Sequence, residues 1–315
     1  MGTGVRIDLT DETEDEGTPA TKRRRVEPQA TSQDSTQARS LAAFFRAKCR
    51  SGSATTAQAI PMRRSIAGDA SNPQAVMLVD TLKQRGMGGT GSHRASVRSP
   101  CSAEASPLSA QVLYLTSDAR SWVVVARKWW PSDREAFSAQ WQMHPQEYHA
   151  IRLFGRICYE TRYSQSWGNG YRYSGTENKA RPIEENPFVA DLIKECNQVA
   201  GWLGPYNTCL QNWYEPRHAI ALHSDDEKSH RLGSAIFSLS WGGPRRFILR
   251  AKDSVSSSSG RSVAEEEIWL HDGDLLVMGG SCQATHKHEV PKVRQKDPVA
   301  TNRINWTVRA FKDVM

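Results

Sequence analysis

Cysteine is scarce in this chain of 315 residues, and the six cysteines are spread along it. They stand at positions 49, 101, 158, 196, 209 and 282 and form neither a C-x-x-C pair nor a tight cluster. This distribution is typical of free thiols in a reducing compartment. It disfavours a disulfide framework, and it disfavours a structural zinc site, because such a site usually draws on cysteine.

Long apolar runs are also missing. The first residues, Met1–Arg6, lack the apolar core of a signal peptide, and no later stretch has the apolar length of a membrane helix. We therefore expect a soluble, intracellular protein with no membrane partner. A monomer is also expected.

Apolar runs are few in the first hundred residues, which are rich in Ser, Thr, Gly, Gln, Ala and charge. Such a segment buries too little apolar surface to offset chain entropy, so residues 1–105 are predicted to form a disordered regulatory tail. All ten tryptophans come after residue 105, the first being Trp122, and they indicate one packed domain over residues 106–315. The net charge of +7 favours an anionic partner.

Two short motifs near the start of the tail suggest targeting and docking. The basic run Lys22–Arg25 is typical of a nuclear localisation signal and predicts a nuclear protein; the alternative is a solvated basic run without a receptor. Ile7 and Leu9, followed by a run of Asp and Glu, resemble a SUMO-interaction motif, in which an added strand brings acidic residues to a basic partner face.

A third tail motif contains Leu41, Phe44 and Phe45. Their spacing resembles that of the motif that docks on the replication sliding clamp, although Ala38 stands where that motif usually has Gln. We expect an apolar turn whose two aromatic rings fill a pocket on the clamp. The alternative is a short amphipathic helix without a partner.

Short segments separated by turn signals dominate the second half of the chain. The pattern is typical of a mainly β fold with flanking helices, and it favours a double-sheet jelly roll. Apolar residues at helical spacing predict a helix over Phe188–Trp202, and a second helix is expected within Gln146–Phe154. The expected strands are 207–214, 219–223, 234–241, 246–251, 267–270, 274–278 and 303–311.

His223 and Asp225 follow a short apolar segment and are separated by one residue. Side chains alternate along a strand, so these two point to the same side. With His288 they provide two imidazoles and one carboxylate, the set that holds non-haem Fe(II) and leaves positions open for oxygen and a co-substrate. His286 lies two residues from His288, so both could face the same side of a strand. His286 is therefore a second, weaker choice for the later histidine.

The segment Arg303–Arg309 alternates polar and apolar residues, which is the period of a half-buried strand. Its polar face is either exposed to water or lines a cavity that binds an anion. Arg suits the second role, because its planar guanidinium matches the two oxygens of a carboxylate. Asn212 and Tyr214 share a face of an earlier expected strand and are able to donate hydrogen bonds to a small ligand.

The order of these motifs resembles the AlkB family of Fe(II)- and 2-oxoglutarate-dependent dioxygenases, and most closely its nuclear nucleic-acid-repair branch. The resemblance covers roughly residues 105–315 and rests on six segments: Asn212–Tyr214, His223–Glu227, Ser238–Phe247, Gly273–Met278, His288–Pro291 and Arg303–Arg309. It implies a double-stranded β-helix, with Fe(II) held by His223, Asp225 and His288. It places 2-oxoglutarate (2OG) against Asn212, Tyr214, Arg303, Asn305 and Arg309, and it implies O2 as the oxidant.

The resemblance also implies a substrate side. The hairpin around Trp167–Gly175 corresponds to a lid over the active site, and Tyr171 and Tyr173 would stack on a base flipped out of its duplex. A hairpin with core aromatics is the alternative. Glu227 matches a family position that contacts the exocyclic amino group of the base. Thr161 precedes Arg162 where the family usually has Pro, so the alignment of the lid residues with those of the family is not fixed.

The implied reaction is oxidative demethylation of 1-methyladenine or 3-methylcytosine in DNA by direct reversal, with release of formaldehyde, succinate and CO2. Three alternatives stay open. The same chemistry could act on RNA or on a protein side chain, or the barrel could be an inactive part of a nuclear adaptor. The complete metal triad and the paired arginines argue against the inactive form, and the tail motifs favour DNA over RNA.

Overall fold

The structure, a computed structural model, describes residues 70–87, 109–153, 156–169, 171–173, 176–201, 204–252, 265–294, 297 and 301–312. The SUMO-interaction, nuclear-localisation and clamp-docking motifs expected in the tail lie outside these residues. Each helix in the described part of the chain is too short or too polar to cross a membrane.

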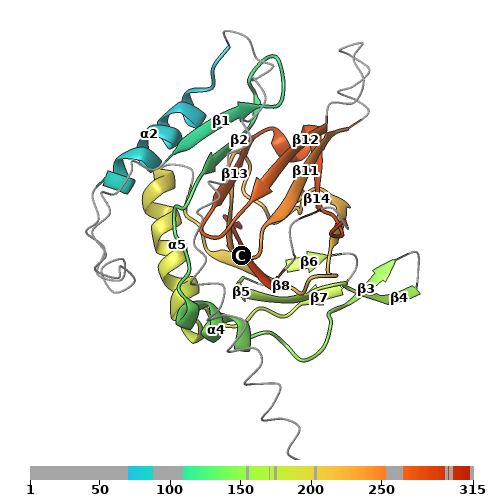
Figure 1. The fold of residues 1–315 in the computed structure, drawn as a ribbon. Helices are drawn as coiled ribbons and strands as arrows, with labels where there is room; N and C mark the ends of the chain where they lie inside the picture. Colours follow the sequence, from blue (N-terminus) through green and yellow to red (C-terminus); the bar gives the residue numbers. More distant parts are fainter. Residues whose placement is uncertain are drawn as a thin grey trace, which may run out of the picture. The chain divides into compact units, whose positions relative to one another are not determined.

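Two antiparallel sheets build the described part of the domain (Figure 1). The larger sheet has seven strands, and their spatial order is β1 (Ala110–Tyr114), β2 (Ser121–Ala126), β13 (Leu275–Gly280), β10 (Ile236–Gly242), β15 (Arg303–Arg309), β8 (Thr208–Tyr214) and β5 (Tyr163–Gly168). The smaller sheet has four, in the order β12 (Glu265–Leu270), β11 (Arg245–Ala251), β14 (His286–Val290) and β9 (Ile220–His223). The predicted jelly roll is confirmed.

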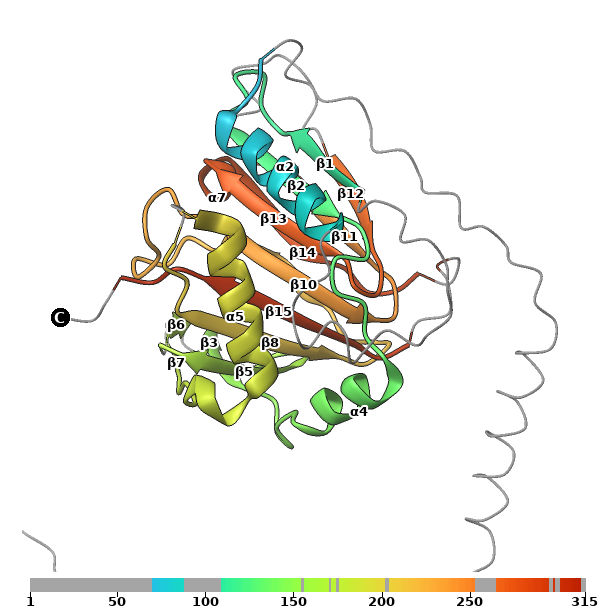
Figure 2. The ribbon, with the colours of Figure 1, turned by 90° about the vertical axis from the view of Figure 1, so that its left-hand side faces the viewer.

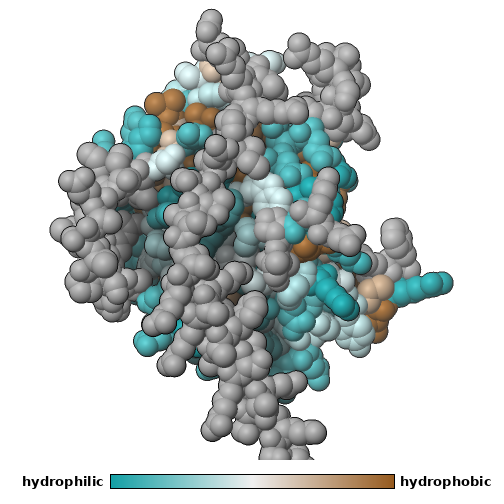
Figure 3. All heavy atoms as spheres, viewed as in Figure 1, coloured by the Kyte–Doolittle hydropathy of each residue, from teal (hydrophilic) through white to brown (hydrophobic). Residues whose placement is uncertain are grey.

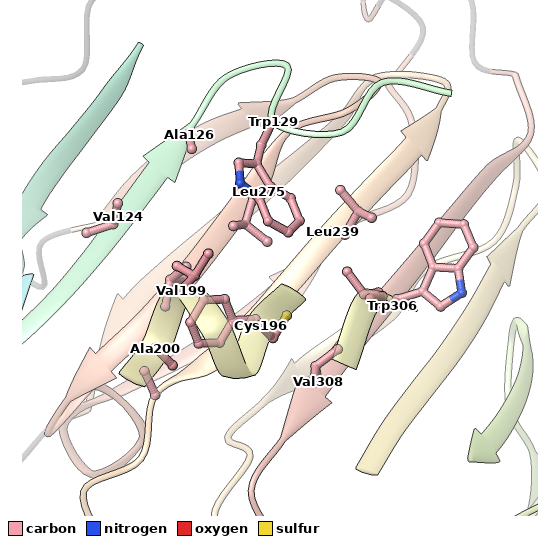
Figure 4. Close-up of a cluster of buried hydrophobic side chains, with 14 of the residues drawn as sticks. Val124, Ala126, Trp129, Cys196, Val199, Ala200, Leu239, Leu275, Trp306 and Val308 are labelled. Carbon is pink, nitrogen blue, oxygen red and sulfur yellow. The ribbon is translucent and has the colours of Figure 1, made fainter. Parts of the chain in front are cut away.

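Alternation along β15 divides the interior into two regions. Ile304, Trp306 and Val308 point to the outer face of the larger sheet, where they join a core that also contains Cys196 and Val199 (Figure 4). The polar residues of β15 point to the other face, toward the smaller sheet. A second apolar cluster lies between the two sheets and includes Val123, Ile236, Phe247, Leu249 and Leu276. The site is therefore enclosed by two packed layers.

Helices cover the outer face of the larger sheet (Figure 2). The helix expected at Phe188–Trp202 is α5 (Pro187–Ala200), which starts where the side chain of Asn186 accepts a hydrogen bond from the backbone N–H of Val189. Its apolar residues Val189, Leu192, Ile193, Cys196 and Val199 are buried. Short helical elements in the described residues are α4 (Arg134–Gln142), the 3-10 turn η1 (Ile183–Glu185) and α7 (Cys282–Thr285).

The helix α2 (Pro73–Met87) lies within the range 1–105 that was expected to be disordered, so the structure differs from the prediction there. Ala75, Leu78, Val79 and Leu82 are buried, and the helix contacts β1, β2 and α5. These four apolar residues follow the spacing i, i+3, i+4, i+7. The surface on which these four residues pack comes from the later domain. The average composition of residues 1–105 therefore gives no sign of this helix.

The prediction of a helix within Gln146–Phe154 is wrong, because β3 (Ala150–Leu153) forms there and pairs with β4 (Arg156–Tyr159). On β4, Ile157 and Tyr159 are 65% and 66% exposed, and apolar surface appears at that end of the molecule in Figure 3. A second hairpin pairs β6 (Tyr171–Tyr173) with β7 (Thr176–Asn178). Both hairpins lie outside the two main sheets.

Candidate active site

Two neighbouring strands of the smaller sheet bring the expected metal ligands together. His223 ends β9, Asp225 follows it in the connecting loop, and His288 lies in the middle of β14, directly opposite His223 in the strand pairing. The Nε2 atoms of His223 and His288 lie 3.6 and 3.9 Å from the carboxylate oxygens of Asp225. One potential ligand atom from each of the three residues can be chosen so that these atoms all lie within 4.8 Å of one another. One cation could therefore be bound by all three.

The protonation states suit a metal. Burial lowers the pKa of His288 to about 3, with His223 adding to the effect, and burial also lowers the pKa of His223. Both imidazoles are therefore neutral at physiological pH, which leaves a lone pair for a cation. Burial alone would raise the pKa of Asp225, but Arg309 and the two histidines outweigh it and hold that pKa well below its usual range. Asp225 is thus ionised, as a metal ligand would need to be.

Contacts around the triad fix its orientation. The Nδ1 of His223 lies 2.8 Å from the carbonyl oxygen of Ala221. When Nδ1 donates this hydrogen bond, the lone pair of the neutral ring is on Nε2, where it is available to a cation. The backbone N–H of Asp225 donates to Oε1 of Gln283 in α7 over 2.9 Å. Ser224 donates through its hydroxyl to the carbonyl oxygen of His286. The loop that carries Asp225 is therefore tied to α7 and to the start of β14.

Of the two later histidines, His288 is the one whose Nε2 lies near Asp225, at 3.9 Å from Oδ2. Within the described residues, the group able to hold a cation contains His288 and not His286. His286 is also buried, but its Nδ1 lies 2.8 Å from the hydroxyl of Thr285. His288 in turn stacks on Phe247, with ring centroids 5.3 Å apart. This packing keeps the imidazole of His288 in one orientation toward Asp225.

The triad opens into a cavity between the two sheets. The predicted residues Asn212, Tyr214, Arg303, Asn305 and Arg309 all line this cavity. The first two come from β8 and the other three from β15, and these strands are adjacent, with Arg303 opposite Tyr214 and Asn305 opposite Asn212. The remaining lining includes Ser238, Met278 and Thr307.

Arg303 is the most informative residue of the cavity wall. It is 1% exposed, and its Nη2 donates to the hydroxyl of Ser240 over 2.9 Å. Its Nε and Nη1 are buried and have no hydrogen-bond partner among the described residues. Its guanidinium carbon lies 5.0 Å from the ring centroid of Tyr214. Burial lowers the pKa of Arg303 to about 10, so the group stays charged at neutral pH. A buried cation with two unused donors is suited to an anionic ligand.

Arg309 and Asn305 have structural partners of their own. Arg309 pairs with Asp225, with Nη2 2.9 Å from Oδ2. Asn305 donates through Nδ2 to the hydroxyl of Ser238 over 2.9 Å and to the carbonyl oxygen of Leu239 over 2.8 Å. Arg309 is therefore positioned to orient the metal carboxylate, and Asn305 to brace β10 against β15.

The sequence interpretation did not assign roles to two residues at this site. Arg162 is 4% exposed and lines the cavity, and Gln283 holds the backbone of Asp225. Neither belongs to a periodic pattern of its own strand or helix. The only sequence signal for Arg162 was its place after Thr161, at the start of the lid segment.

The expected substrate residues are less fully described. Tyr171 and Tyr173 lie in β6, which pairs with β7, as expected for a hairpin; their side chains are outside the described part of the structure. Glu227 follows Asp225 in the loop after β9, called the metal loop below. Its Oε2 is buried without a hydrogen-bond partner among the described residues. Burial, together with the nearby Asp225, raises the pKa of Glu227 against the opposing effect of Arg309.

Residues 123–309 match the family model described as "2OG-Fe(II) oxygenase superfamily". The chain belongs to this superfamily. Together with the relatives below, this match confirms the AlkB-like assignment made from the motifs. The matched segment contains the triad and all five predicted co-substrate residues.

Two curated relatives and one solved structure illustrate the similarity. The chain is 32% identical over 164 residues to human "DNA oxidative demethylase ALKBH2", covering 50% of this chain and 60% of the relative. It is 29% identical over 160 residues to the "RNA replication protein" of Grapevine virus A, covering 50% of this chain and 8% of the relative. The structure titled "The structure of OsALKBH1" matches with a TM-score of 0.40 and 16% identity, over 60% of this chain and 96% of that one. The chain thus spans only part of the length of these curated relatives.

Proposed function

We propose that this chain is an Fe(II)- and 2OG-dependent dioxygenase that removes methyl groups from base nitrogens in DNA. One observation carries the proposal. A cavity between two sheets contains a His–carboxylate–His group at one side and, at another, the buried Arg303, whose Nε and Nη1 have no hydrogen-bond partner among the described residues. These are the two features that a metal and a dicarboxylate co-substrate require together.

The donor set fits Fe(II). Two imidazoles and one carboxylate occupy one side of a cation and leave its other positions for small ligands. His223, Asp225 and His288 would hold the ion, and Arg309 would orient the carboxylate of Asp225. When bound, iron with 2OG and O2 supplies the oxidising power that the side chains of this site lack.

The wall opposite the triad fits 2OG. The unused Nε and Nη1 of Arg303 offer two donors to the distal carboxylate of the co-substrate, and Tyr214 lies beside this guanidinium. Asn212 from the adjacent strand adds an amide to the same wall. Apolar residues such as Phe247, Met278 and Val290 complete the lining and limit water in the site.

The substrate follows from similarity to the AlkB-like relatives. Human ALKBH2 is named a "DNA oxidative demethylase", and we infer that methylated adenine or cytosine is the base on which this chain acts. Hydroxylation of the N-methyl group gives a hemiaminal that releases formaldehyde, while 2OG yields succinate and CO2. Glu227, beside the metal loop, is the proposed contact to the base. Action on DNA would place the protein in the nucleus.

RNA is the second candidate substrate. One observation favours it: half of the chain resembles part of an RNA replication protein from Grapevine virus A. The chemistry at the metal would be identical, so the residues of the triad do not distinguish DNA from RNA. The 2′-hydroxyl of the substrate would have to be read by residues outside the metal centre.

The test uses the full chain with Fe(II), 2OG and matched oligonucleotides that carry 1-methyladenine or 3-methylcytosine, as DNA and as RNA. Formaldehyde and succinate are measured in parallel. We expect methyl loss from DNA, and we expect Asp225→Ala to abolish both products while its circular dichroism stays native. Methyl loss from RNA alone would support the second candidate. Succinate release by Asp225→Ala at the parent rate would contradict the metal assignment.

A further inference from the structure

A buried polar network stands behind the co-substrate wall. Arg162 lies just before β5, and its Nε donates to Oδ1 of Asn212 over 2.8 Å. Its Nη2 donates to Oε1 of Glu160 over 3.1 Å, and Ser164 donates to the other oxygen of Glu160 over 2.7 Å. Arg162, Glu160, Ser164 and Asn212 are each at most 6% exposed.

The chemistry of this contact decides how Asn212 is oriented. An arginine Nε–H can only donate, so the atom of Asn212 that faces it has to be the oxygen. The amide nitrogen, Nδ2, then points away from Arg162. No residue in the described part of the structure accepts a hydrogen bond from Nδ2, and Asn212 lines the cavity. Nδ2 is therefore presented to the cavity as a donor.

The orientation matters because an asparagine amide has two opposite ends. If the amide were reversed, its oxygen would face the cavity in place of its N–H groups. That oxygen would repel the carboxylate or carbonyl oxygens of a co-substrate. Glu160 balances the charge of Arg162 within the network. Arg162 is thus suited to fixing a neighbouring side chain, whereas Arg303 retains two buried donors for an anion.

We propose that Arg162 is a positioning residue for co-substrate binding, which acts by holding the amide of Asn212 with its N–H groups toward the cavity. The inference rests on the proposed function, because it takes 2OG as the ligand. It also joins two parts of the fold. Arg162 belongs to the segment that links the β3–β4 hairpin to β5, so this segment and the co-substrate wall share one hydrogen-bond network.

The experiment measures 2OG binding by calorimetry on the full chain loaded with Fe(II) under nitrogen, so turnover does not contribute. We expect Arg162→Lys to weaken binding at least roughly fivefold, the size of one net hydrogen bond, because Lys has one nitrogen in place of the separate Nε and Nη2 that donate to Asn212 and Glu160. Fe(II) affinity should not change. The matched control is Arg85→Met, which removes an arginine–glutamate pair between α2 and α5, away from the cavity.

Two Asn212 variants separate positioning from a merely structural role. On the Asn212→Ala background, Arg162→Lys should cause no further loss, since its effect passes through the amide. Asn212→Asp retains an acceptor for Arg162 but turns a carboxylate oxygen to the cavity, so it should bind 2OG more weakly than Asn212→Ala. If Arg162→Lys fails to fold, the charge-neutral pair Glu160→Gln with Arg162→Met takes its place.

Parent-like 2OG binding by the Arg162 variant would overturn the inference and leave the proposed function intact. The same holds if the loss is equal on the parent and Asn212→Ala backgrounds. A parent chain that binds Fe(II) but takes up no 2OG would instead refute the proposed function, and this inference with it.

Discussion

Arg309 and Asp225 form a buried ion pair between β15 and the metal loop, with Nη2 of Arg309 2.9 Å from Oδ2 of Asp225. Both side chains are at most 5% exposed. The pair connects the two sheets, because β15 belongs to the larger sheet and the loop follows β9 of the smaller one. The carboxylate that would bind the metal is thus oriented by the same strand that provides Arg303.

Replacing Arg309 by Met tests whether this pair serves the metal. Removing one partner leaves the carboxylate buried without its cation, so Asp225 should lose its fixed orientation. We predict that Arg309→Met lowers Fe(II) affinity by at least roughly tenfold. Metal titration under nitrogen measures it, with Arg127→Met, which breaks a pair with Asp274 outside the cavity, as control. Equal metal affinity in Arg309→Met and parent would show that the pair has no role in metal binding.

Gln283 provides a second, independent support for the same loop. Its Oε1 accepts from the backbone N–H of Asp225, and its Nε2 lies 3.3 Å from the sulfur of Met278. We predict that Gln283→Leu lowers Fe(II) affinity about tenfold and leaves 2OG binding to the metal-loaded form nearly unchanged. Gln111→Leu, at an exposed position of β1, is the control. A loss of 2OG affinity without loss of metal affinity would contradict the assignment.

Strand periodicity predicted much of the site. The alternation in Arg303–Arg309 separates the cavity face from the core face, and the structure shows that division, with Trp306 in the core and Arg303 in the cavity wall. The spacing of His223 and Asp225 likewise places two ligand groups together. In Arg303–Arg309 the local period alone determines which side a residue faces, whereas Asp225 lies in the loop after β9 and is also held by Gln283.

Other features depended on tertiary pairing. The segment of β14, His-Lys-His-Glu-Val, has no apolar alternation and was not predicted as a strand. It is held by β11 and β9 on its two sides. Arg162 reaches Asn212 only because β5 pairs with β8, with Ser164 opposite Asn212. No pattern within one segment indicates such a contact between segments.

His230 should make stability depend on pH. Burial lowers its pKa from 6.5 to about 4, with Arg309 and Lys312 adding to the effect and Asp225 opposing it. The unfolded chain then binds a proton more readily than the folded one. Stability from this residue is therefore present above pH 6.5 and is lost as the pH falls toward 4. Because His230 is partly exposed, the expected loss of unfolding free energy is reduced to about 2 kcal/mol.

Urea unfolding of the metal-free parent and of His230→Gln, between pH 7.5 and pH 4, isolates this contribution, because the other histidines are common to both. The parent should lose more unfolding free energy over this range than the variant does. Parallel pH profiles for the two proteins would contradict the prediction. Ser234, whose hydroxyl lies 3.4 Å from Nε2 of His230, can be replaced by Ala to confirm that any effect arises from the imidazole.

Arg303→Lys tests the co-substrate anchor itself. Arg303 keeps two buried donors, Nε and Nη1, without partners, and a guanidinium can place two parallel hydrogen bonds on one carboxylate where an ammonium cannot. We predict that the Michaelis constant for 2OG rises at least roughly tenfold, on the order of 1.4 kcal/mol. Fe(II) affinity should barely change, since Arg303 does not contact the triad. Titration of 2OG at fixed iron, with Arg309→Lys in parallel, separates the two arginines. An unchanged constant for Arg303→Lys beside a large rise for Arg309→Lys would show that Arg309, despite its pairing with Asp225, is the anchor of the distal carboxylate.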